Sequence, residues 1–279
     1  MKNFILSAFA DEAGSAVSEQ IDALKGNGFT HIEVRGVNGK NITALTIEEA
    51  KELKKQLDDG GISVWSIGSP LGKISVGDEF APHLDLFKHT LELAKVLDTT
   101  HIRMFSFFCP KGEADLCREI VFDRLGKFCE AAKGSGILLC HENEKGIYGD
   151  TADRCLDVLK NFPDLKGVFD PANFLQCKQD TLRAWDMLEP YLEYLHIKDV
   201  RDDGTVVPAG MGAGHLPELL DRFEKMGGKA VSVEPHLSVF KGLAELENEG
   251  EKTKIGEFQY ESQRAAFNAA ASALVNLIK

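Results

Sequence analysis

Residues 137–170 read ILLCHENEKGIYGDTADRCLDVLKNFPDLKGVFD, and this stretch contains the structural unit that repeats along the chain. It begins with a β-rich run over Ile137–Glu142, continues with a helical pattern over Thr151–Leu159, and ends with a second β-rich run over Gly167–Asp170. Runs of consecutive apolar positions are typical of strands that are covered on both faces. The stretch therefore predicts a strand, a helix and a further strand.

The same alternation extends over all 279 residues. Strands are expected at Phe4–Phe9, His31–Arg35, Ser63–Ile67, His101–Phe107, Ile137–Glu142, Gly167–Asp170, Tyr194–Asp199 and Ala230–Glu234. Helices are expected from Ile21 to Gly26, from Thr46 to Gly60, and at Pro82–Leu97, Cys117–Lys133, Thr151–Leu159, Leu182–Leu192, Leu216–Met226 and Ser262–Ile278. Eight alternating pairs predict the α/β class and a (β/α)8 barrel. An open, doubly wound sheet is the alternative, but no Gly-x-Gly-x-x-Gly motif follows the first strand.

The length allows either two ordinary domains or one large barrel. Glycine and proline are spread as turn residues and form no linker, so a single barrel domain over 1–279 is expected. The polar and charged segment 237–261 is expected to be a long loop or a lid that follows the eighth strand.

Composition excludes several classes of partner. The formal charge is 32 − 44 = −12, which opposes binding by phosphate neutralisation, so a nucleic acid is not expected. No stretch approaches the roughly 18 uninterrupted apolar residues of a membrane helix. The first apolar run is short and is followed by the acidic residues Asp11 and Glu12, which a cleaved signal peptide would not normally show, so no signal peptide is expected. The six cysteines form no CxxC pair and suit reduced thiols, which predicts a cytoplasmic protein.

Four successive strands end on side chains that can bind a metal: Glu142, Asp170, His196 and Glu234. In such a barrel, catalytic residues lie at the carboxyl ends of the strands. Three carboxylates and one imidazole suit one divalent cation, with Mn2+ or Mg2+ favoured and Co2+ or Zn2+ also compatible. Solvated loop charges are the alternative, but carboxylates that directly follow apolar runs need a compensating charge. Glu144 lies on the same strand face as Glu142, so either could serve.

The motifs at these strand ends resemble those of a known family. They are Phe9-Ala10-Asp11-Glu12, Ile32-Glu33-Val34-Arg35, His141-Glu142-Asn143, Asp170-Pro171-Ala172-Asn173, His196-Ile197-Lys198-Asp199, Gly210-Met211-Gly212 and Glu234. On these residues the chain resembles the sugar phosphate isomerase/epimerase family, which has the xylose isomerase-like TIM barrel. The resemblance implies that Glu142, Asp170, His196 and Glu234 bind a divalent metal. The chain differs from the ketose 3-epimerases of this family at two positions: those enzymes tend to have histidine where this chain has Glu144 and Asn173.

The resemblance and the ligand set together suggest a function. We expect a metal-dependent isomerase or epimerase of a small sugar, sugar phosphate or hydroxyketone, which abstracts a proton next to a carbonyl through a metal-stabilised enediolate. Glu142 and Glu234 would be metal ligands that double as catalytic acid and base. Substrate-binding roles are expected for Glu33, Arg35, Asn173, Lys198 and Arg201, the last being an approximate counterpart of a family arginine.

Simpler roles remain open for several of these residues. Glu33 and Arg35 could form a mutual ion pair, and Lys198 could pair with Asp199 across its loop. His236 directly follows Glu234-Pro235 and could face the site, but an exposed loop histidine is expected. His101 begins its strand, at the opposite end of the barrel from the site, and is expected to be structural. The glycine-rich turn at 210–214 could offer N–H groups to a phosphate or could only connect two elements.

Other functions stay open on the same scaffold. The main alternative is a sugar or cyclitol dehydratase, in which the same enolate would expel water. A repair nuclease like endonuclease IV would want additional histidine ligands and a basic surface, which the charge opposes. A binding protein without catalysis is a further alternative. The expected partner is a small carbohydrate substrate, with no nucleic acid and no membrane, and a homo-oligomer is left open.

Overall fold

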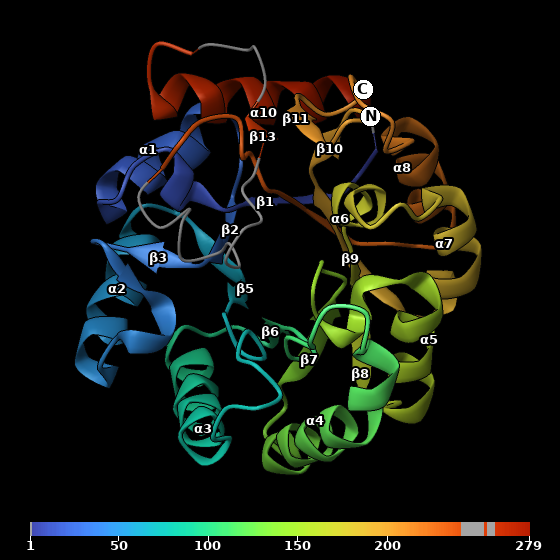
Figure 1. Cartoon of the computed structure of the whole chain (residues 1–279). Helices are drawn as coiled ribbons and strands as arrows, with labels where there is room; N and C mark the ends of the chain where they lie inside the picture. The colour runs from blue at the N-terminus through green and yellow to red at the C-terminus, as the bar shows by residue number, and fades with distance from the viewer. Residues whose placement is uncertain (1, 241–253, 256–259) are drawn as a thin grey trace.

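The strands form a nearly closed barrel at the centre of the molecule (Figure 1). The computed structural model describes residues 2–240, 254–255 and 260–279. The eight barrel strands are β1 (Ile5–Ala8), β2 (His31–Val34), β5 (Ser63–Gly68), β6 (His101–Met104), β7 (Leu138–Glu142), β8 (Leu165–Phe169), β9 (Leu192–Ile197) and β12 (Ala230–Val233). They are hydrogen-bonded in parallel in the order β1-β12-β9-β8-β7-β6-β5-β2, and β1 also contacts β2. The predicted barrel is confirmed.

Eight helices alternate with these strands and surround the barrel in Figure 1. They are α1 (Val17–Gly26), α2 (Ile47–Asp59), α3 (Ala81–Val96), α4 (Arg118–Ala132), α5 (Ala152–Asn161), α7 (Thr181–Leu188), α8 (Leu216–Lys225) and α10 (Gln263–Leu277). Helix α8 shows why they pack on the barrel, because its buried residues Leu216, Leu219, Leu220 and Phe223 share one face. The capping box at the start of α2 is confirmed, since the Glu49 amide donates to Thr46 Oγ1 at 3.1 Å and Thr46 N donates to Glu49 Oε2 at 2.9 Å.

The predicted helix over 182–192 is too long. Helix α7 ends at Leu188, a 3-10 turn covers Glu189–Tyr191, and β9 already begins at Leu192. Pro190 explains the difference, because it has no N–H to donate and disrupts a continuing helix. The expected fourth strand also stops early, at Met104 instead of Phe107.

Several short elements were not expected from the sequence. Helix α6 (Pro171–Gln176) begins directly after β8. A small sheet joins β10 (Asp199–Val200), β11 (Thr205–Val207) and β13 (Lys254–Ile255), and a hairpin pairs β3 (Gly36–Val37) with β4 (Lys40–Asn41). The suggestion of a loop or lid over 237–261 falls largely outside the described residues.

The barrel interior changes character toward the carboxyl ends of its strands. Its apolar layer contains Cys140, Val168, Tyr194 and Ala230. Side chains alternate along a strand, so the residue two positions further on also points inward. After Cys140, Val168 and Tyr194 these inward positions are Glu142, Asp170 and His196. The same alternation takes β12 through Ser232 to Glu234. The fold therefore directs the four predicted metal ligands to one end of the interior.

The opposite end of the barrel holds a different cluster. His101 Nε2 lies 3.3 Å from Glu193 Oε1, and the His101 ring stacks on Trp65 with 4.4 Å between centroids. These contacts agree with the structural role expected for His101. All six cysteines lie within the described residues and are free thiols. None of the described helices is both long enough and apolar enough to cross a bilayer.

Candidate active site

The four predicted metal ligands lie together at the carboxyl end of the barrel. Glu142 ends β7, Asp170 follows β8, His196 lies in β9 and Glu234 follows β12. All four side chains are buried, and each offers one ligand atom within 4.8 Å of the others. Three carboxylates and one imidazole at this spacing are a donor set for one divalent cation.

Asp170 gives a direct test of whether a cation fits. One carboxylate oxygen, Oδ1, accepts a hydrogen bond from Asn173 N at 2.9 Å and caps α6. The other, Oδ2, is 2.8 Å from Lys198 Nζ but is out of line for a hydrogen bond, so it is buried without a hydrogen-bond donor among the described residues. Burial raises the pKa of Asp170 to about 7. A carboxylate in this state is stabilised by an added cation, so the residues fit a metal.

His196 is held between two carboxylates. Its Nδ1 lies 3.0 Å from Glu142 Oε1 and its Nε2 lies 3.2 Å from Glu33 Oε2. Burial disfavours the charged ring, but the Glu142 and Glu33 carboxylates outweigh it and raise the pKa of His196 to about 10. The Nδ1 side faces the other metal-competent groups, while the Nε2 side is fixed by Glu33, an arrangement common in metal-binding histidines.

Glu33 therefore contacts a candidate ligand and does not line the site itself. It is fully buried, and Tyr194 donates its hydroxyl to Glu33 Oε1 at 2.7 Å. Burial would raise its pKa, but the charge of His196 outweighs that effect and the pKa is lowered. Among the described contacts Glu33 forms no pair with Arg35, so the mutual ion pair considered for these two residues is not present.

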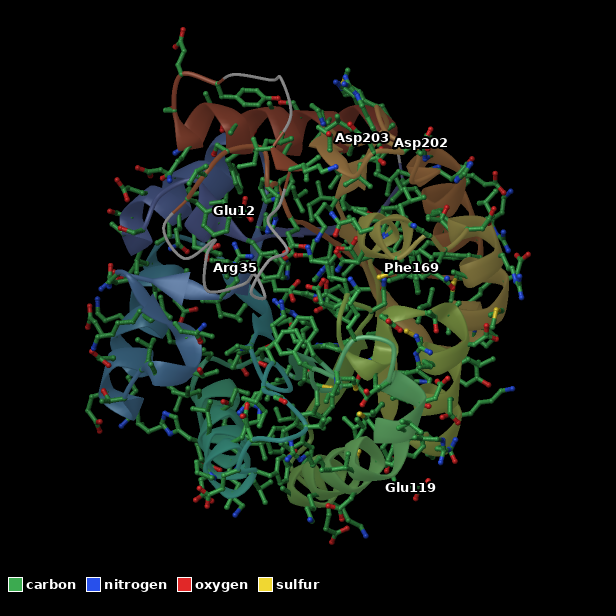
Figure 2. The ribbon with its side chains drawn as sticks, in the orientation of Figure 1. Glu12, Arg35, Glu119, Phe169, Asp202 and Asp203 are labelled. Carbon is green, nitrogen blue, oxygen red and sulfur yellow. The ribbon has the colours of Figure 1, made fainter. Side chains whose placement is uncertain are left out.

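Arg35 belongs to a separate network that reaches the site through Glu234. Its guanidinium binds Asp11 through two nitrogens at 2.9 and 3.0 Å and Glu12 at 3.0 Å. It lies 3.4 Å from Glu234 Oε1 and packs over the Phe9 ring at 4.5 Å. Figure 2 labels Glu12 and Arg35, which come from the first two barrel strands and their loops. Arg35, at the carboxyl end of β2, thus contacts Glu234 at the same end of the barrel.

His236 corrects the expectation of an exposed loop histidine. It is only 6% exposed, its backbone N donates to Glu12 Oε2 at 2.7 Å, and its ring Nδ1 lies 3.3 Å from Glu12 Oε1. Its φ of 45° turns the chain sharply after Pro235. Burial raises the pKa of Glu12 to about 8. The sequence pattern could not show this contact because the two residues are 224 positions apart.

Two asparagines hold the ends of β7 and β8 in place. Asn143 Oδ1 accepts from Asp170 N and Asn143 Nδ2 donates to Asp170 O, both at 2.9 Å. Asn173 Nδ2 donates to the Asn143 carbonyl oxygen at 3.0 Å and lies 3.4 Å from Glu142 Oε1. These bonds fix the distance between Glu142 and Asp170.

Lys198 bridges two candidate ligands and does not pair with Asp199. Its Nζ lies 2.8 Å from Asp170 Oδ2 and 2.7 Å from Glu234 Oε2. Burial opposes its charge, but the Asp170 and Glu234 carboxylates outweigh that effect and raise the pKa of Lys198. Burial would likewise raise the pKa of Glu234, but Lys198 outweighs it and the pKa lies well below its usual range.

Asp199 occupies the glycine-rich turn. Its carboxylate accepts from Gly210 N at 2.9 Å, Gly212 N at 3.0 Å and Gly214 N at 2.9 Å. A Cβ atom at Gly212 would lie 2.3 Å from Asp199 Oδ1, so this position needs glycine. The N–H groups considered as a phosphate site are therefore already bound to a carboxylate of the chain itself.

Arg103, on β6, is a site residue that the sequence analysis missed. Its Nε lies 3.2 Å from Glu142 Oε2 and its Nη1 donates to the Ser69 carbonyl oxygen at 3.1 Å. The alternation of β6 could have identified it, because Arg103 is two positions after His101 on the inward face. Arg201, in contrast, is exposed, and its neighbours Asp202 and Asp203 lie near the outer edge of the view in Figure 2. The structure does not bring Arg201 to the four ligands.

Two of the candidate ligands, Glu142 and Glu234, line a hollow at this end of the barrel. Its lining consists of Arg35, Lys73, Arg103, Phe105, Glu142, Glu144, Lys145, Asn173, Gln176, Lys198, Val206, Glu234 and His236. Of the two glutamates considered on β7 and its loop, Glu142 joins the ligand group, while Glu144 lies 3.1 Å from Lys73.

Known proteins share this architecture. No curated protein matches the chain in sequence. The probable 3-DHS dehydratase AsbF from Bacillus anthracis is 19% identical, with a TM-score of 0.74 and 99% of each chain covered. The zinc-bound IOLI protein is 15% identical, with a TM-score of 0.75 over 99% of this chain and 98% of that one. D-Psicose 3-epimerase from Clostridium cellulolyticum H10, solved with D-tagatose, is 15% identical, with a TM-score of 0.74 over 99% and 100%.

These identities establish a shared fold and leave the activity open. A sequence model of one family matches residues 21–253, which is most of the chain. The chain therefore belongs to the xylose isomerase-like TIM barrel family.

Proposed function

We propose that the protein is a metal-dependent isomerase or epimerase that moves a proton at the carbon next to the carbonyl of a small sugar or hydroxyketone. The observation that carries the proposal is the group of four buried donors within 4.8 Å of one another. The fold is shared with epimerases, including D-psicose 3-epimerase and the Escherichia coli 3-keto-D-glucoside 4-epimerase. It is also shared with proteins solved with zinc and with magnesium.

Glu142, Asp170, His196 and Glu234 would hold the metal, with Mn2+ or Mg2+ preferred by a donor set rich in oxygen. When bound, such an ion polarises a carbonyl oxygen and stabilises the negative charge that develops when a neighbouring proton leaves. Glu33 would keep the proton on His196 Nε2, so that Nδ1 is available as a ligand atom.

Glu234 and Glu142 are the candidate base and acid. Glu234 is held ionised by Lys198 and can accept a proton at a carboxylate oxygen. Glu142 lines the same hollow from β7, which is separated from β12 by β8 and β9. A substrate carbon between them would meet one carboxylate on each side. That arrangement supports inversion at one carbon or proton transfer between neighbouring carbons.

Substrate hydroxyl groups would bind to the hydrogen-bonding side chains that line the hollow. Asn173, Lys198 and Arg35 are in that lining, and Lys198 Nζ is an ammonium donor beside both Asp170 and Glu234. Arg201 is exposed and is left out of this proposal.

The test is deuterium uptake from D2O. The protein is loaded with Mn2+ and incubated with ketoses and hydroxyketones, and exchange at the carbon next to the carbonyl is followed by NMR. We expect uptake that stops on chelation and returns with added Mn2+. Asp170→Asn is the matched negative control because it keeps the size of the side chain. Absence of metal-dependent uptake with every compound would overturn the proposal.

The same samples distinguish a dehydratase. Lys198 is a buried ammonium that could protonate a leaving hydroxyl group, which is the structural observation in favour of that alternative. Dehydration would appear as a new enone or keto-acid absorbance together with deuterium uptake. Uptake without the absorbance supports isomerisation or epimerisation.

A further inference from the structure

We propose that the substrate carries a carboxylate, which binds to Lys73 and Arg103 on the wall of the hollow formed by β6 and the loop after β5. The inference rests on the proposed function, because it assigns a chemical class to the substrate of that same site. We call these two residues and the ring between them, Phe105, the anion wall.

The charge of the hollow differs from that of the chain. The chain carries a formal charge of −12, but the lining has five cations, Arg35, Lys73, Arg103, Lys145 and Lys198, against three carboxylates, Glu142, Glu144 and Glu234. Asp11 and Asp170 lie just outside this lining and pair with two of its cations, Arg35 and Lys198, while a divalent ion held by the candidate ligands would add two positive charges. A substrate entering the hollow therefore meets a positive lining on a negative protein, which favours an anion.

Two cations of the anion wall share one aromatic ring. Lys73 Nζ lies 4.4 Å from the Phe105 ring centroid, and Arg103 Cζ lies 4.6 Å from the same centroid. The side chains are only 10% and 4% exposed, so water screens their mutual repulsion weakly. Glu144 and Glu142 offset part of this charge, at 3.1 Å from Lys73 and 3.2 Å from Arg103 Nε.

Arg103 has bonding capacity that the protein leaves unused. Its Nε is buried and has no hydrogen-bond partner among the described residues, since the close Glu142 oxygen is out of line for one. The Arg103 side chain also lines the hollow, and a ligand carboxylate there would meet a guanidinium, with which charge-assisted bonds are short and strong. Once Glu142 also binds a cation, less of its negative charge is available to Arg103, and the need for another anion grows.

The backbone holds Lys73 in place. Phe105 N donates to the Leu71 carbonyl oxygen at 2.8 Å, and Phe107 N donates to the Gly72 carbonyl oxygen at 2.9 Å. Gly72 has φ 84°, and a Cβ there would lie 2.1 Å from the Phe105 carbonyl oxygen, so only glycine permits this approach. The loop is thus attached to the chain that follows β6, and Lys73 is preorganised against Phe105.

A carboxylate fits these donors better than a phosphate. Phosphate sites commonly use the backbone N–H groups of glycine-rich turns. In this chain, the N–H groups of Gly210, Gly212 and Gly214 bind Asp199. The anion wall offers one guanidinium and one ammonium, groups that bind carboxylates and phosphates alike, so the occupied glycine-rich turn is the observation that favours a carboxylate.

The experiment compares matched ligands that differ in one group. Binding to the Mn2+-loaded protein is measured by calorimetry for hydroxypyruvate, dihydroxyacetone and dihydroxyacetone phosphate, and for fructuronate, fructose and fructose 6-phosphate. We expect the carboxylate of at least one series to bind at least about tenfold more tightly than its neutral and phosphorylated partners, the size of one charge-assisted hydrogen bond. A preference for the phosphate, or no preference in either series, would overturn the inference.

Lys73→Met locates the effect. It should remove the preference for the carboxylate while the affinities for the neutral ligand and for Mn2+ stay unchanged. Lys88→Met is the matched control, because Lys88 is exposed on α3 and its ion pair among the described residues is a local one with Asp85. An equal loss for neutral and acidic ligands in Lys73→Met would contradict the assignment. Because binding needs no turnover, failed deuterium uptake with intact carboxylate preference would count against the proposed function alone.

Discussion

Both ends of the barrel pair a histidine with a glutamate, but only one end is suited to chemistry. At the amino end, His101 lies 3.3 Å from Glu193, and the two side chains are 12% and 25% exposed. At the carboxyl end, His196 lies 3.0 Å from Glu142 and 3.2 Å from Glu33, and none of the three side chains is more than 3% exposed. The residue types are the same, and the surroundings differ.

The difference is the number of charges that are removed from water together. At the amino end, one carboxylate faces one ring, and solvent reaches both. At the carboxyl end, four carboxylates are buried together with four basic side chains: Glu33, Glu142, Asp170 and Glu234 with His196, Lys198, Arg35 and Arg103. Buried carboxylates in this number need more positive charge than one side chain supplies. A histidine–carboxylate pair therefore indicates a metal site only where further buried acids converge on it.

The largest effect is expected from removing one converging acid. Asp170→Asn should lower Mn2+ binding severely and reduce kcat/KM by at least about a thousandfold, since a metal ion contributes several kcal/mol to stabilising developing charge. Metal content and deuterium exchange rates measure both effects. Glu193→Gln, the matched change at the amino end, should leave both intact. A similar loss of Mn2+ binding and kcat/KM in Glu193→Gln would contradict the proposal that only the carboxyl end of the barrel holds the metal.

A smaller effect is expected from Glu33→Gln. In the present protein, Glu33 Oε2 lies 3.2 Å from His196 Nε2. The glutamine amide keeps the shape of the side chain but removes the negative charge beside that ring nitrogen. Mn2+ affinity should fall by about 10- to 100-fold, which is typical when the partner of a metal-binding histidine is changed. Calorimetric titration with Mn2+ measures it. Unchanged affinity would show that Glu33 does not orient the ring.

The pH dependence of stability gives a third comparison. Burial raises the pKa of Glu12 from 4.5 to about 8, so folded Glu12 keeps a proton that the unfolded chain has released. The contribution of this proton to the free energy of unfolding is complete below pH 4.5 and is lost as pH rises through 8. The raised pKa of Asp170, from 3.8 to about 7, acts in the same direction between pH 3.8 and 7, and that of His196, from 6.5 to about 10, does so between pH 6.5 and 10.

The melting temperature of the metal-free protein should therefore fall between pH 6.5 and 8, with a slope of up to about 1.4 kcal/mol per pH unit for each proton. Glu12→Gln should make this fall shallower, and differential scanning calorimetry measures both slopes. Parallel curves for the two proteins would contradict the shifted pKa of Glu12.

The smallest effect is expected at the amino end. His101→Phe keeps a ring against Trp65 and removes the contact between His101 Nε2 and Glu193 Oε1. The free energy of unfolding should change by less than about 1 kcal/mol, because partly exposed pairs contribute little. Denaturant titration and kcat/KM, which should not change, check this. A large loss of activity would mean that the amino end influences the site.

The sequence predicted the repeating framework well because strand and helix periodicity are local. Eight strands, the Thr46 capping box and the convergence of Glu142, Asp170, His196 and Glu234 all follow from spacing and from the rule that strand ends meet. The residues it misjudged depend on contacts across the barrel. His236 is buried by Glu12, and Glu33 supports His196, pairs separated by 224 and 163 positions. No local pattern encodes such partners.

The order of the barrel strands has a consequence for folding. In the ladders of the described residues, β1 is hydrogen-bonded only to β12. The backbone hydrogen bonds of β1 to the barrel therefore cannot form before residues 230–233 are present. Lys2 N likewise donates to the Ile278 carbonyl oxygen at 2.8 Å. Contacts between distant parts of a chain form slowly because a long loop must close first. During synthesis the strands from β2 to β9 can pair in the order in which they are made, whereas the barrel closes only after β12 has been synthesised.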